Sequence, residues 1–328
     1  MRNKILTLLR QSGEKYISGE EIADKLGVSR TAVWKHIKEM RAQGYDIESH
    51  ARSGYILREA PDALLSGEIH HGLETKIIGQ EIICHEEIDS TNNEAKRLAR
   101  NGAVEGTVVV AESQTGGKGR LERKFFSPKG KGIWFSVILR PKFLPQEAPK
   151  CTLMAAVAVA RAMEEFGLEP GIKWPNDLLY ENKKLVGILT EMSAEMDGIN
   201  YIVIGTGINV NIDQSDFPGD IRDVATSLSM MKGEQLPRVK FFQAVLRAMD
   251  DLYGKVQREG FAPVLEEWRK YSITLGQEVK VIGVRDGEVY FGKAVDIDAD
   301  GALLVDTAEG RQRVLAGDVS IRPRSGKW

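Results

Sequence analysis

Hydrophobic positions in the first 60 residues follow a helical period and then a strand period. Apolar side chains recur with helical spacing in residues 5–9, 22–26 and 33–40, which predicts three short amphipathic helices. Beyond residue 44 the spacing changes to alternation, which predicts a two-stranded hairpin in residues 45–57.

The boundaries between these predicted elements carry suitable residue types. Ser18, followed three residues later by Glu21, forms a capping box at the start of the second helix. Gly27 ends that helix, and Ser29 can cap the next one. A short helix, a glycine turn and a second helix are typical of a helix-turn-helix.

The side of the third helix that lies off the apolar stripe is basic. The first residues of a recognition helix meet base edges and later cations meet phosphates, so we expect DNA binding here. The stretch resembles the winged helix-turn-helix of bacterial repressors, and a helical protein-interaction module is the alternative. The expected DNA-binding residues are Ser29, Arg30, Thr31, Trp34, Lys35, Lys38 and, at the hairpin tip, Arg52.

Alternating strand and helix patterns begin at residue 76 and indicate a mixed α/β domain. Asp197-Gly198 is a hairpin signal within it. Beyond residue 275, short apolar runs predict a small region of strands with turns at Asp286-Gly287 and Asp300-Gly301. The expected strands of the α/β region are residues 77–88, 107–111, 132–139, 184–189 and 201–205, and its expected helices are 91–100 and 149–166.

One loop combines glycines, cations and an aromatic pair. Residues 114–128 read Gln-Thr-Gly-Gly-Lys-Gly-Arg-Leu-Glu-Arg-Lys-Phe-Phe-Ser-Pro. Glycines let backbone N–H groups approach a ligand, and clustered cations suit a phosphate or a carboxylate. The loop is not a Walker A motif, because Glu112 stands where the first glycine is required. A flexible, solvated basic loop is the alternative interpretation.

Three further polar motifs stand at the ends of predicted elements. Ser90-Thr91-Asn92 starts a helix, where these side chains either cap it or bind a polar ligand. Residues 173–177 read Lys-Trp-Pro-Asn-Asp, and the Asn-Asp pair can orient a ligand or a metal-bound phosphate. Lys184 opens an apolar strand, where it either extends to solvent or points a cation into a pocket.

Composition and charge fit two or three globular domains. The 328 residues are 42% apolar and 28% charged, and no apolar run approaches the roughly 20 residues of a membrane span. Residues 1–60 hold 11 basic and 8 acidic residues, a net charge of +3, against 34 and 39 in the remainder, a net charge of −5. A basic end on an acidic body hints at nucleic-acid contact. Two cysteines, Cys84 and Cys151, fit a reducing cytoplasm.

Taken in order, these motifs resemble the biotin protein ligase family. The basic loop, the Lys-Trp-Pro-Asn-Asp turn, the strand from Lys184 and the segment Gly205-Thr206-Gly207-Ile208-Asn209 occur together. The helix-turn-helix in front of them resembles the bifunctional branch of that family, the ligases that also repress the biotin operon.

The resemblance implies an α+β chain of three domains. These are a winged helix-turn-helix in residues 1–62, a mixed-sheet ligase domain of the biotin/lipoate type in 63–273, and a small SH3-like β-barrel in 274–328. Pro61 and the polar segment to about residue 73 are expected to form the linker.

The resemblance also implies an activity. Biotin and ATP give biotinoyl-5′-adenylate and pyrophosphate, with Mg²⁺ accompanying the ATP. The adenylate then acylates one lysine of a biotin carboxyl carrier domain. In the bifunctional branch the adenylate is also the corepressor of a homodimer that binds the operator of biotin genes. No membrane contact is implied.

Each motif residue takes a role by this resemblance. The catalytic set is Arg120, Lys184, Lys118 and Asp177, and Asp177 can also meet Mg²⁺. The biotin-binding set is Ser90, Thr91, Asn92, Gln114, Lys118, Gly119, Arg120, Lys184, Gly205 and Gly207, where the glycines let the backbone approach the ligand. The ATP and adenylate set is Gly117, Arg123, Phe125, Asn176 and Asn209.

The loop departs from the family pattern Gly-Arg-Gly-Arg-Arg-Gly-Arg-x-Trp. Lys118 keeps the charge of an arginine but not its two-pronged hydrogen bonding. Leu121-Glu122 replaces a basic residue and a glycine, which predicts a stiffer and less positive loop. Two alternatives stay open: a ligase for another acid such as lipoate, and a metabolite-binding repressor without catalysis.

Overall fold

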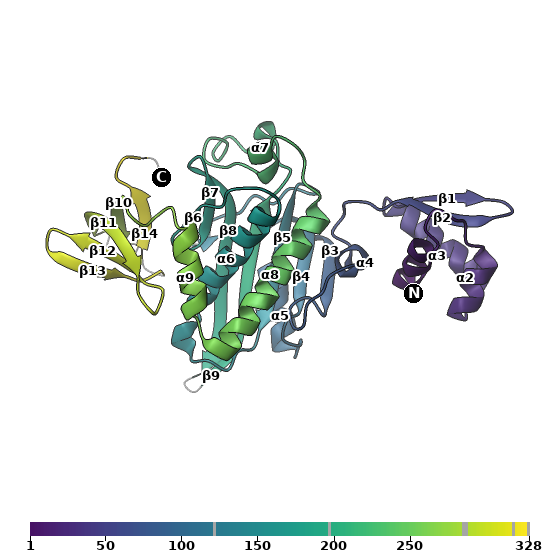
Figure 1. Ribbon diagram of the computed structural model, residues 1–328, viewed down its shortest axis with the longest axis horizontal. Coiled ribbons are helices and arrows are strands. Elements are labelled where there is room, and N and C mark those ends of the chain that lie inside the picture. The colour runs from purple at the N-terminus through teal and green to yellow at the C-terminus, as the bar shows by residue number, and fades with distance from the viewer. Residues whose placement is uncertain (121–122, 196–197, 284–287, 317–318, 327–328) are drawn as a thin grey trace. The chain divides into compact units, whose positions relative to one another are not determined.

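The computed structural model describes the chain except for residues 121–122, 196–197, 284–287, 317–318 and 327–328. The chain divides into two compact units, Met1–Gly72 and Leu73–Trp328 (Figure 1). Leu121-Glu122, Asp197 and the Asp286-Gly287 turn therefore lie outside the described residues.

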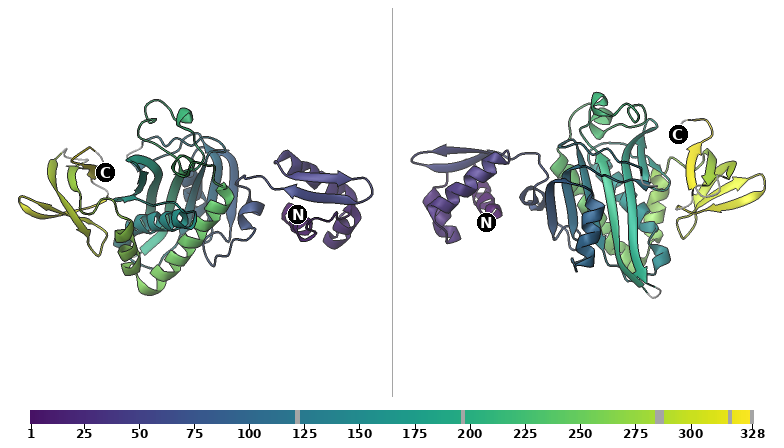
Figure 2. Two further views of the ribbon diagram at one scale, coloured as in Figure 1. Left: turned by 45° about the horizontal axis from the view of Figure 1, so that its top comes forward. Right: turned by 180° about the vertical axis from the view of Figure 1, so that it is seen from behind.

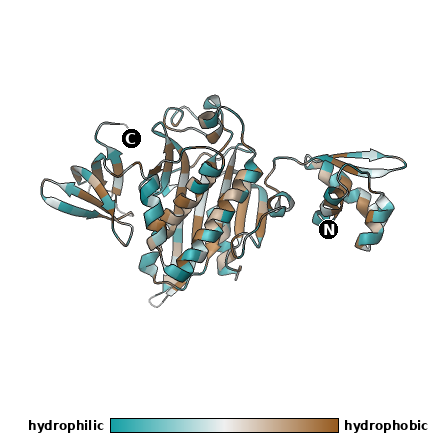
Figure 3. Cartoon of the chain, viewed as in Figure 1, coloured by the Kyte–Doolittle hydropathy of each residue, from teal (hydrophilic) through white to brown (hydrophobic). Residues whose placement is uncertain are grey.

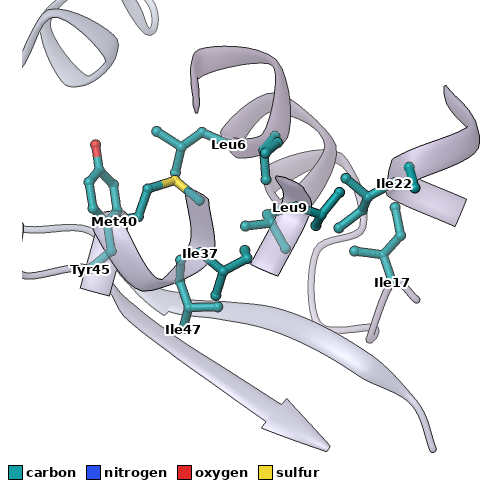
Figure 4. Close-up of a cluster of buried hydrophobic side chains, with 11 residues drawn as sticks. Leu6, Leu9, Ile17, Ile22, Ile37, Met40, Tyr45 and Ile47 are labelled. Atoms are coloured by element: carbon teal, nitrogen blue, oxygen red, sulfur yellow. The ribbon is translucent and has the colours of Figure 1, made fainter. Parts of the chain in front are cut away.

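Three helices and a two-stranded wing form the N-terminal unit. Its core gathers apolar side chains from all three helices, and Figure 4 shows Leu6, Leu9, Ile22 and Ile37 pointing toward one another. The predicted helix-turn-helix and hairpin are confirmed. The elements are α1 (Arg2–Gln11), α2 (Gly19–Leu26), α3 (Arg30–Ala42), β1 (Asp46–His50) and β2 (Gly54–Glu59).

Both predicted serine caps are present. Ser18 Oγ accepts a hydrogen bond from the Glu21 N–H at 3.0 Å, and Ser29 Oγ accepts one from Ala32 at 3.2 Å. The Glu21 carboxylate accepts from Lys25 Nζ at 2.7 Å, so it pairs along the helix instead of closing the expected capping box. The two caps thus satisfy one free N–H group at the start of each helix.

The segment expected to be a polar linker contains a short helix, α4 (Ser66–His70). Glu68 on this helix is buried, with its side chain 8% exposed, and it pairs with Arg10 of α1 at 2.6 Å. The Tyr45 hydroxyl donates to the same carboxylate at 2.6 Å. These contacts pack this part of the expected linker into the N-terminal unit. They also supply the partners that a buried carboxylate requires.

A seven-stranded sheet forms the centre of the second unit, in the order β3-β4-β5-β9-β8-β7-β6. Only the β3–β4 pair is parallel among the described pairings of this sheet. The strands are β3 (Ile82–Ile88), β4 (Val108–Gln114), β5 (Gly132–Leu139), β6 (Ile172–Lys173), β7 (Asp177–Tyr180), β8 (Lys183–Glu195) and β9 (Gly198–Asn209).

Helices cover both faces of this sheet. Figures 1 and 2 show α6 (Lys150–Glu165), α8 (Arg238–Glu259) and α9 (Ala262–Tyr271) on one face and α5 (Thr91–Arg100) on the other. The short helix α7 (Leu228–Lys232) follows β9. Figure 3 shows the hydrophobic residues gathered in the strands between these layers. Among the described residues, no helix is both long and apolar enough to cross a bilayer.

The first strand of the sheet begins later than predicted. The N–H groups of Lys76, Ile77 and Ile78 donate to the Asp250 carboxylate of α8 at 2.7 to 2.8 Å. A side-chain carboxylate thus replaces a neighbouring strand, and β3 starts at Ile82. At the other end of the α/β region, β9 continues beyond Gly205 to Asn209 and forms the longest pairing with β8.

Five antiparallel strands form the C-terminal part of the second unit, in the order β13-β12-β11-β10-β14. Trp174 Nε1 donates to the Gly301 carbonyl at 3.1 Å, and Lys150 Nζ donates to the Ala299 carbonyl at 3.0 Å, so this sheet is tied to the central domain. The strands are β10 (Glu278–Gly283), β11 (Val289–Ile297), β12 (Leu303–Thr307), β13 (Gly310–Val314) and β14 (Val319–Pro323).

The buried carboxylate of α4 gives a prediction for stability. Glu68→Gln keeps the shape of the side chain but weakens hydrogen bonds to a charged group, at a cost of about 1.5–3 kcal/mol. We expect faster amide hydrogen exchange in residues 2–11, measured by mass spectrometry. Glu14→Gln, at an exposed position of the same unit, is the control. Equal exchange in both variants would show that the α4 contact does not stabilise the unit.

Candidate active site

Two adjoining cavities lie on the α5 side of the central sheet, beneath the glycine-rich loop. The larger has a volume of about 290 Å³, and the smaller is lined mainly by polar groups and backbone. The residues that line both cavities are Gly119, Arg120, Phe125, Asn176 and Lys184. The two spaces therefore share a wall that comes from the loop and from the ends of β7 and β8.

The start of α5 faces the smaller cavity. Ser90 is the N-cap residue, but its side chain makes no capping hydrogen bond. The Thr91 N–H has no acceptor within the helix, because it belongs to the first turn. It donates instead to Gln114 Oε1 at 2.9 Å. The interpretation of this motif as a simple helix cap is therefore wrong, because a side chain from β4 takes the role of the cap.

Glycines in β8 and β9 line the smaller cavity because other side chains of this protein pack directly above them. The sequence did not reveal this packing. A Cβ on Gly205 would lie 1.9 Å from Asn92 Oδ1, and a Cβ on Gly207 would lie 2.4 Å from Phe125 Cε1. Gly187, which pairs with Gly207 across β8 and β9, would bring a Cβ within 2.8 Å of the same ring. Side chains of this protein thus occupy the space above these glycines.

The glycine-rich loop folds back on itself in its described part. The Gly119 N–H donates to the Arg123 carbonyl at 2.7 Å, and the Phe125 N–H donates to the Gly117 carbonyl at 2.8 Å. The Phe125 ring packs edge-on against Trp134 with centroids 5.9 Å apart, and Phe125 lines both cavities. These two backbone hydrogen bonds bring the residues on both sides of the turn close together.

Arg120 connects this loop with the C-terminal sheet. Its Nη1 donates to Asn176 Oδ1 at 3.1 Å, and its Nη2 donates to the Val319 carbonyl at 3.3 Å and to the Ala316 carbonyl. Burial lowers the pKa of the Arg120 guanidinium, while Asp177 opposes this shift. A half-buried guanidinium between the two cavities places a fixed positive charge where they meet.

Two lysines extend this positive region into the larger cavity. Lys184 Nζ forms an ion pair with Asp177 Oδ1 at 2.7 Å and lies 5.8 Å from the centre of the Phe125 ring. Lys184 therefore points into the site, although it is partly accessible to solvent. Burial lowers the pKa of Lys173 to about 8, and the nearby Asp177 charge partly compensates.

The structure brings the predicted ligand-binding residues together around these two cavities, with one exception. Gly117 does not line either cavity. It packs against the returning part of the loop instead, where a Cβ would lie 2.6 Å from the Phe125 carbonyl oxygen. Asn209, from the end of β9, lines the larger cavity and donates to the Thr226 carbonyl at 2.9 Å.

The sequence reasoning missed several residues of the larger cavity. Lys173 was visible in the Lys-Trp-Pro-Asn-Asp motif but received no role. The apolar wall after β9 and the side chains from β14 had no periodic or motif signal. These missed residues are Phe217, Ile221, Val224, Ala225, Val319, Ser320, Ile321 and Arg322.

A separate groove on the N-terminal unit collects part of the predicted DNA-binding set. Arg30, Thr31 and Trp34 of α3 line it together with Arg52 of the wing. Trp34 is 55% exposed, and Lys38 Nζ lies 5.5 Å from the centre of its indole ring. Lys35 is exposed beside this groove, whereas Ser29 serves as the α3 cap.

A metal cluster is not found in the described part of the chain. None of its groups of His, Cys, Asp and Glu side chains brings together the three or more ligands that would hold an ion. The Asp177 carboxylate faces the larger cavity, but it is already paired with Lys184. A divalent ion here would depend on oxygen atoms of a bound phosphate.

Three segments of the chain match known protein families. Residues 85–209 match the biotin/lipoate A/B protein ligase family, residues 1–56 match a helix-turn-helix domain, and residues 274–322 match the biotin protein ligase C-terminal domain. The matched segments follow the same order as the structural regions that carry the groove, the two cavities and the C-terminal sheet.

Individual proteins resemble the chain over nearly its whole length. It is 43% identical over 322 residues to the bifunctional ligase/repressor BirA of Bacillus subtilis, covering 98% of each chain. It is 32% identical to BirA of Escherichia coli, covering 97% of this chain and 96% of that protein. A biotin protein ligase from Aquifex aeolicus, solved with biotin and ATP, matches 74% of this chain and 99% of its own, at 32% identity and a TM-score of 0.65. The chain therefore belongs to the BirA family of bifunctional biotin protein ligases and repressors.

Proposed function

We propose that this chain joins biotin to the AMP part of ATP, with release of pyrophosphate, and transfers the biotinyl group to a lysine of a biotin carboxyl carrier domain. The observation that carries the proposal is the pair of adjoining cavities with a shared cationic wall. Residues from four separate motifs converge on it, and each was expected to bind biotin or ATP. A relative from Aquifex aeolicus was solved with both ligands.

The smaller cavity suits the head group of biotin. A ureido group carries two N–H donors and one carbonyl acceptor, and it requires fixed polar partners in a buried site. Ser90, Thr91, Asn92 and Gln114 supply such groups around this cavity. The valeryl chain would then lead past Phe125 toward Lys118, Arg120 and Lys184, so that the biotin carboxylate meets these cations.

The larger cavity suits ATP. Its apolar wall accepts the adenine, and the cations at its junction with the smaller cavity face the α-phosphate. A biotin carboxylate oxygen attacks the α-phosphorus atom, and the bond to pyrophosphate breaks. Two anions approach each other in this step, so fixed cations lower the barrier. Mg²⁺ would enter with the ATP phosphates, with Asp177 as one neighbouring carboxylate.

The second step uses the same site. The amine of the acceptor lysine attacks the acyl carbonyl of the adenylate, AMP leaves, and the amine loses a proton. Asp177 lies at the mouth of the larger cavity beside Lys184 and can orient the incoming amine. Covering of the adenylate by the loop would limit its hydrolysis by water.

The groove on the N-terminal unit supports a second activity. We infer that biotinoyl-adenylate favours a homodimer whose two helix-turn-helix units bind a two-fold operator of biotin genes. Such coupling requires the adenylate to bind the dimer more tightly than the monomer. The cytoplasmic location expected from the sequence is part of this proposal.

Two other functions would use the same fold. A lipoate ligase would need a pocket without polar partners for a urea group, and the cluster at the start of α5 favours biotin. A repressor without catalysis would not need three cations, Lys118, Arg120 and Lys184, in the wall of the smaller cavity.

The proposed ligase activity is tested by exchange of radiolabelled pyrophosphate into ATP. We expect exchange with biotin but not with lipoate. Lys184→Ala should raise the activation free energy of exchange by about 2–4 kcal/mol, because a fixed cation at the developing charge is lost. Lys129→Ala, which removes an exposed lysine paired with Glu86, is the control. Exchange without any added acid, or an unchanged rate for Lys184→Ala, would contradict the proposal.

Lys173 predicts a pH dependence of ATP binding. Its pKa of about 8 means that its charge is present below pH 8 and is lost as the pH rises through that value. Because ATP is an anion, its KM should increase between pH 7.5 and pH 9.5, by up to about tenfold for each pH unit above the pKa. Lys173→Arg keeps its charge and should flatten this profile. A wild-type profile that matches that of Lys173→Arg would exclude a role for Lys173.

The N-terminal groove predicts separable effects on DNA and on ligation. Lys35→Ala should weaken operator binding and reduce the slope of log affinity against log salt by about 1, as for one lost phosphate contact. Pyrophosphate exchange should not change, because Lys35 belongs to the other unit. Lys15→Ala, at an exposed lysine outside the groove, is the matched control for a filter-binding titration. Equal salt slopes for both variants would place the DNA elsewhere.

A further inference from the structure

The side chain of Asn92 lines the smaller cavity and is hydrogen-bonded to side chains of β8 and β5. Asn92 is in the first turn of α5, is 6% exposed and lines this cavity. Its Oδ1 lies directly over Gly205, where a Cβ would come within 1.9 Å of it. The side chain thus has one position, but an amide in one position can still present its oxygen or its nitrogen to a given neighbour.

Two acceptors on β8 face the amide nitrogen of Asn92. The Leu189 carbonyl makes a long contact at 3.4 Å, and the shorter contact comes from Glu191. Its Oε2 accepts a hydrogen bond from Asn92 Nδ2 at 2.8 Å, and its Oε1 pairs with Lys96 Nζ at 2.7 Å. Burial favours the protonated acid, but the hydrogen bonds from Lys96 and Asn92 outweigh it and lower the pKa of Glu191. An ionised carboxylate only accepts hydrogen bonds, so the amide nitrogen of Asn92 must face it.

The other end of the amide then faces the inside of the sheet. Ser136 Oγ donates to Asn92 Oδ1 at 2.6 Å and lies 2.8 Å from Thr91 Oγ1. Thr91 Oγ1 is in turn 3.2 Å from Gln114 Oε1. A hydroxyl has a single proton, so the directions of these hydrogen bonds depend on which end of Asn92 meets Ser136.

We propose that Glu191 is a positioning residue for biotin, because it fixes the amide of Asn92 and with it the pattern of donors and acceptors in the smaller cavity. This inference rests on the proposed function, in which that cavity holds the ureido group. A buried polar site discriminates strongly when its donors and acceptors are fixed, since a mismatched ligand leaves them unpaired. Glu191 itself acts through Asn92 and is assigned no contact with the ligand.

The test is the variant Glu191→Gln, which keeps the size of the side chain but can donate as well as accept. Asn92 Nδ2 then keeps only its longer hydrogen bond to the Leu189 carbonyl, at 3.4 Å, so the amide can turn more easily. We expect the Kd of biotin, measured by calorimetry on the full chain, to increase at least about tenfold, as for the loss of a hydrogen bond to a charged group. The Kd of ATP should not change, because ATP is assigned to the other cavity.

A double-mutant cycle separates positioning from general destabilisation. In an Asn92→Ala background, Glu191→Gln should cause no further loss of biotin affinity, because the residue it positions is absent. Effects of the two variants that simply add would overturn the proposal. So would an unchanged biotin Kd in Glu191→Gln alone. Glu86→Gln is the matched control. It changes an exposed carboxylate on the edge strand β3 that is paired with Lys129.

Two further measurements keep the outcome decisive. If Glu191→Gln does not fold, as judged by its thermal transition, Ser136→Ala tests the opposite end of the same amide and should weaken biotin binding without affecting ATP. Unchanged biotin affinity in Ser136→Ala would then overturn the proposal. Failure of the wild-type chain to bind biotin at all would instead reject the proposed function.

Discussion

The site depends on a strip of backbone without side chains at the centre of the sheet. Gly187, Gly205 and Gly207 are on β8 and β9, and the space that their Cβ atoms would fill holds the Asn92 amide and the Phe125 ring. Helix α5 can approach the sheet, and the loop can close over it, because this strip is bare. Phe125, which packs over this strip, lines both cavities.

The features that sequence reasoning predicted well are local ones. Ser18, Gly27 and Ser29 determine the helix-turn-helix through short-range hydrogen bonds and backbone conformation, and such signals lie within a few residues of each other. The motif residues of the site were also found, because each motif is contiguous. Their gathering around two cavities followed from the family resemblance and not from periodicity.

The features that were missed depend on partners far away in the sequence. Asp250 delays the start of β3 by binding backbone N–H groups more than 170 positions earlier, and no pattern near residue 77 indicates it. In the sequence, Glu68 belongs to a polar segment that resembles a linker, and only the fold brings Arg10 and Tyr45 to its carboxylate. The role of Gln114 as the cap of α5 was equally invisible, since a cap is normally sought beside the helix it serves.

Phe125 belongs to the walls of both cavities, and this has a consequence for the order of events. In the proposed function, each of the two substrates would therefore contact Phe125 from its own cavity. A molecule that spans both sides of the ring gains from linkage, because its second half binds at high effective concentration. In the proposed function the adenylate is such a molecule, and it should therefore leave more slowly than either precursor. Its own length would then help to retain this reactive intermediate, in addition to the loop that would cover it.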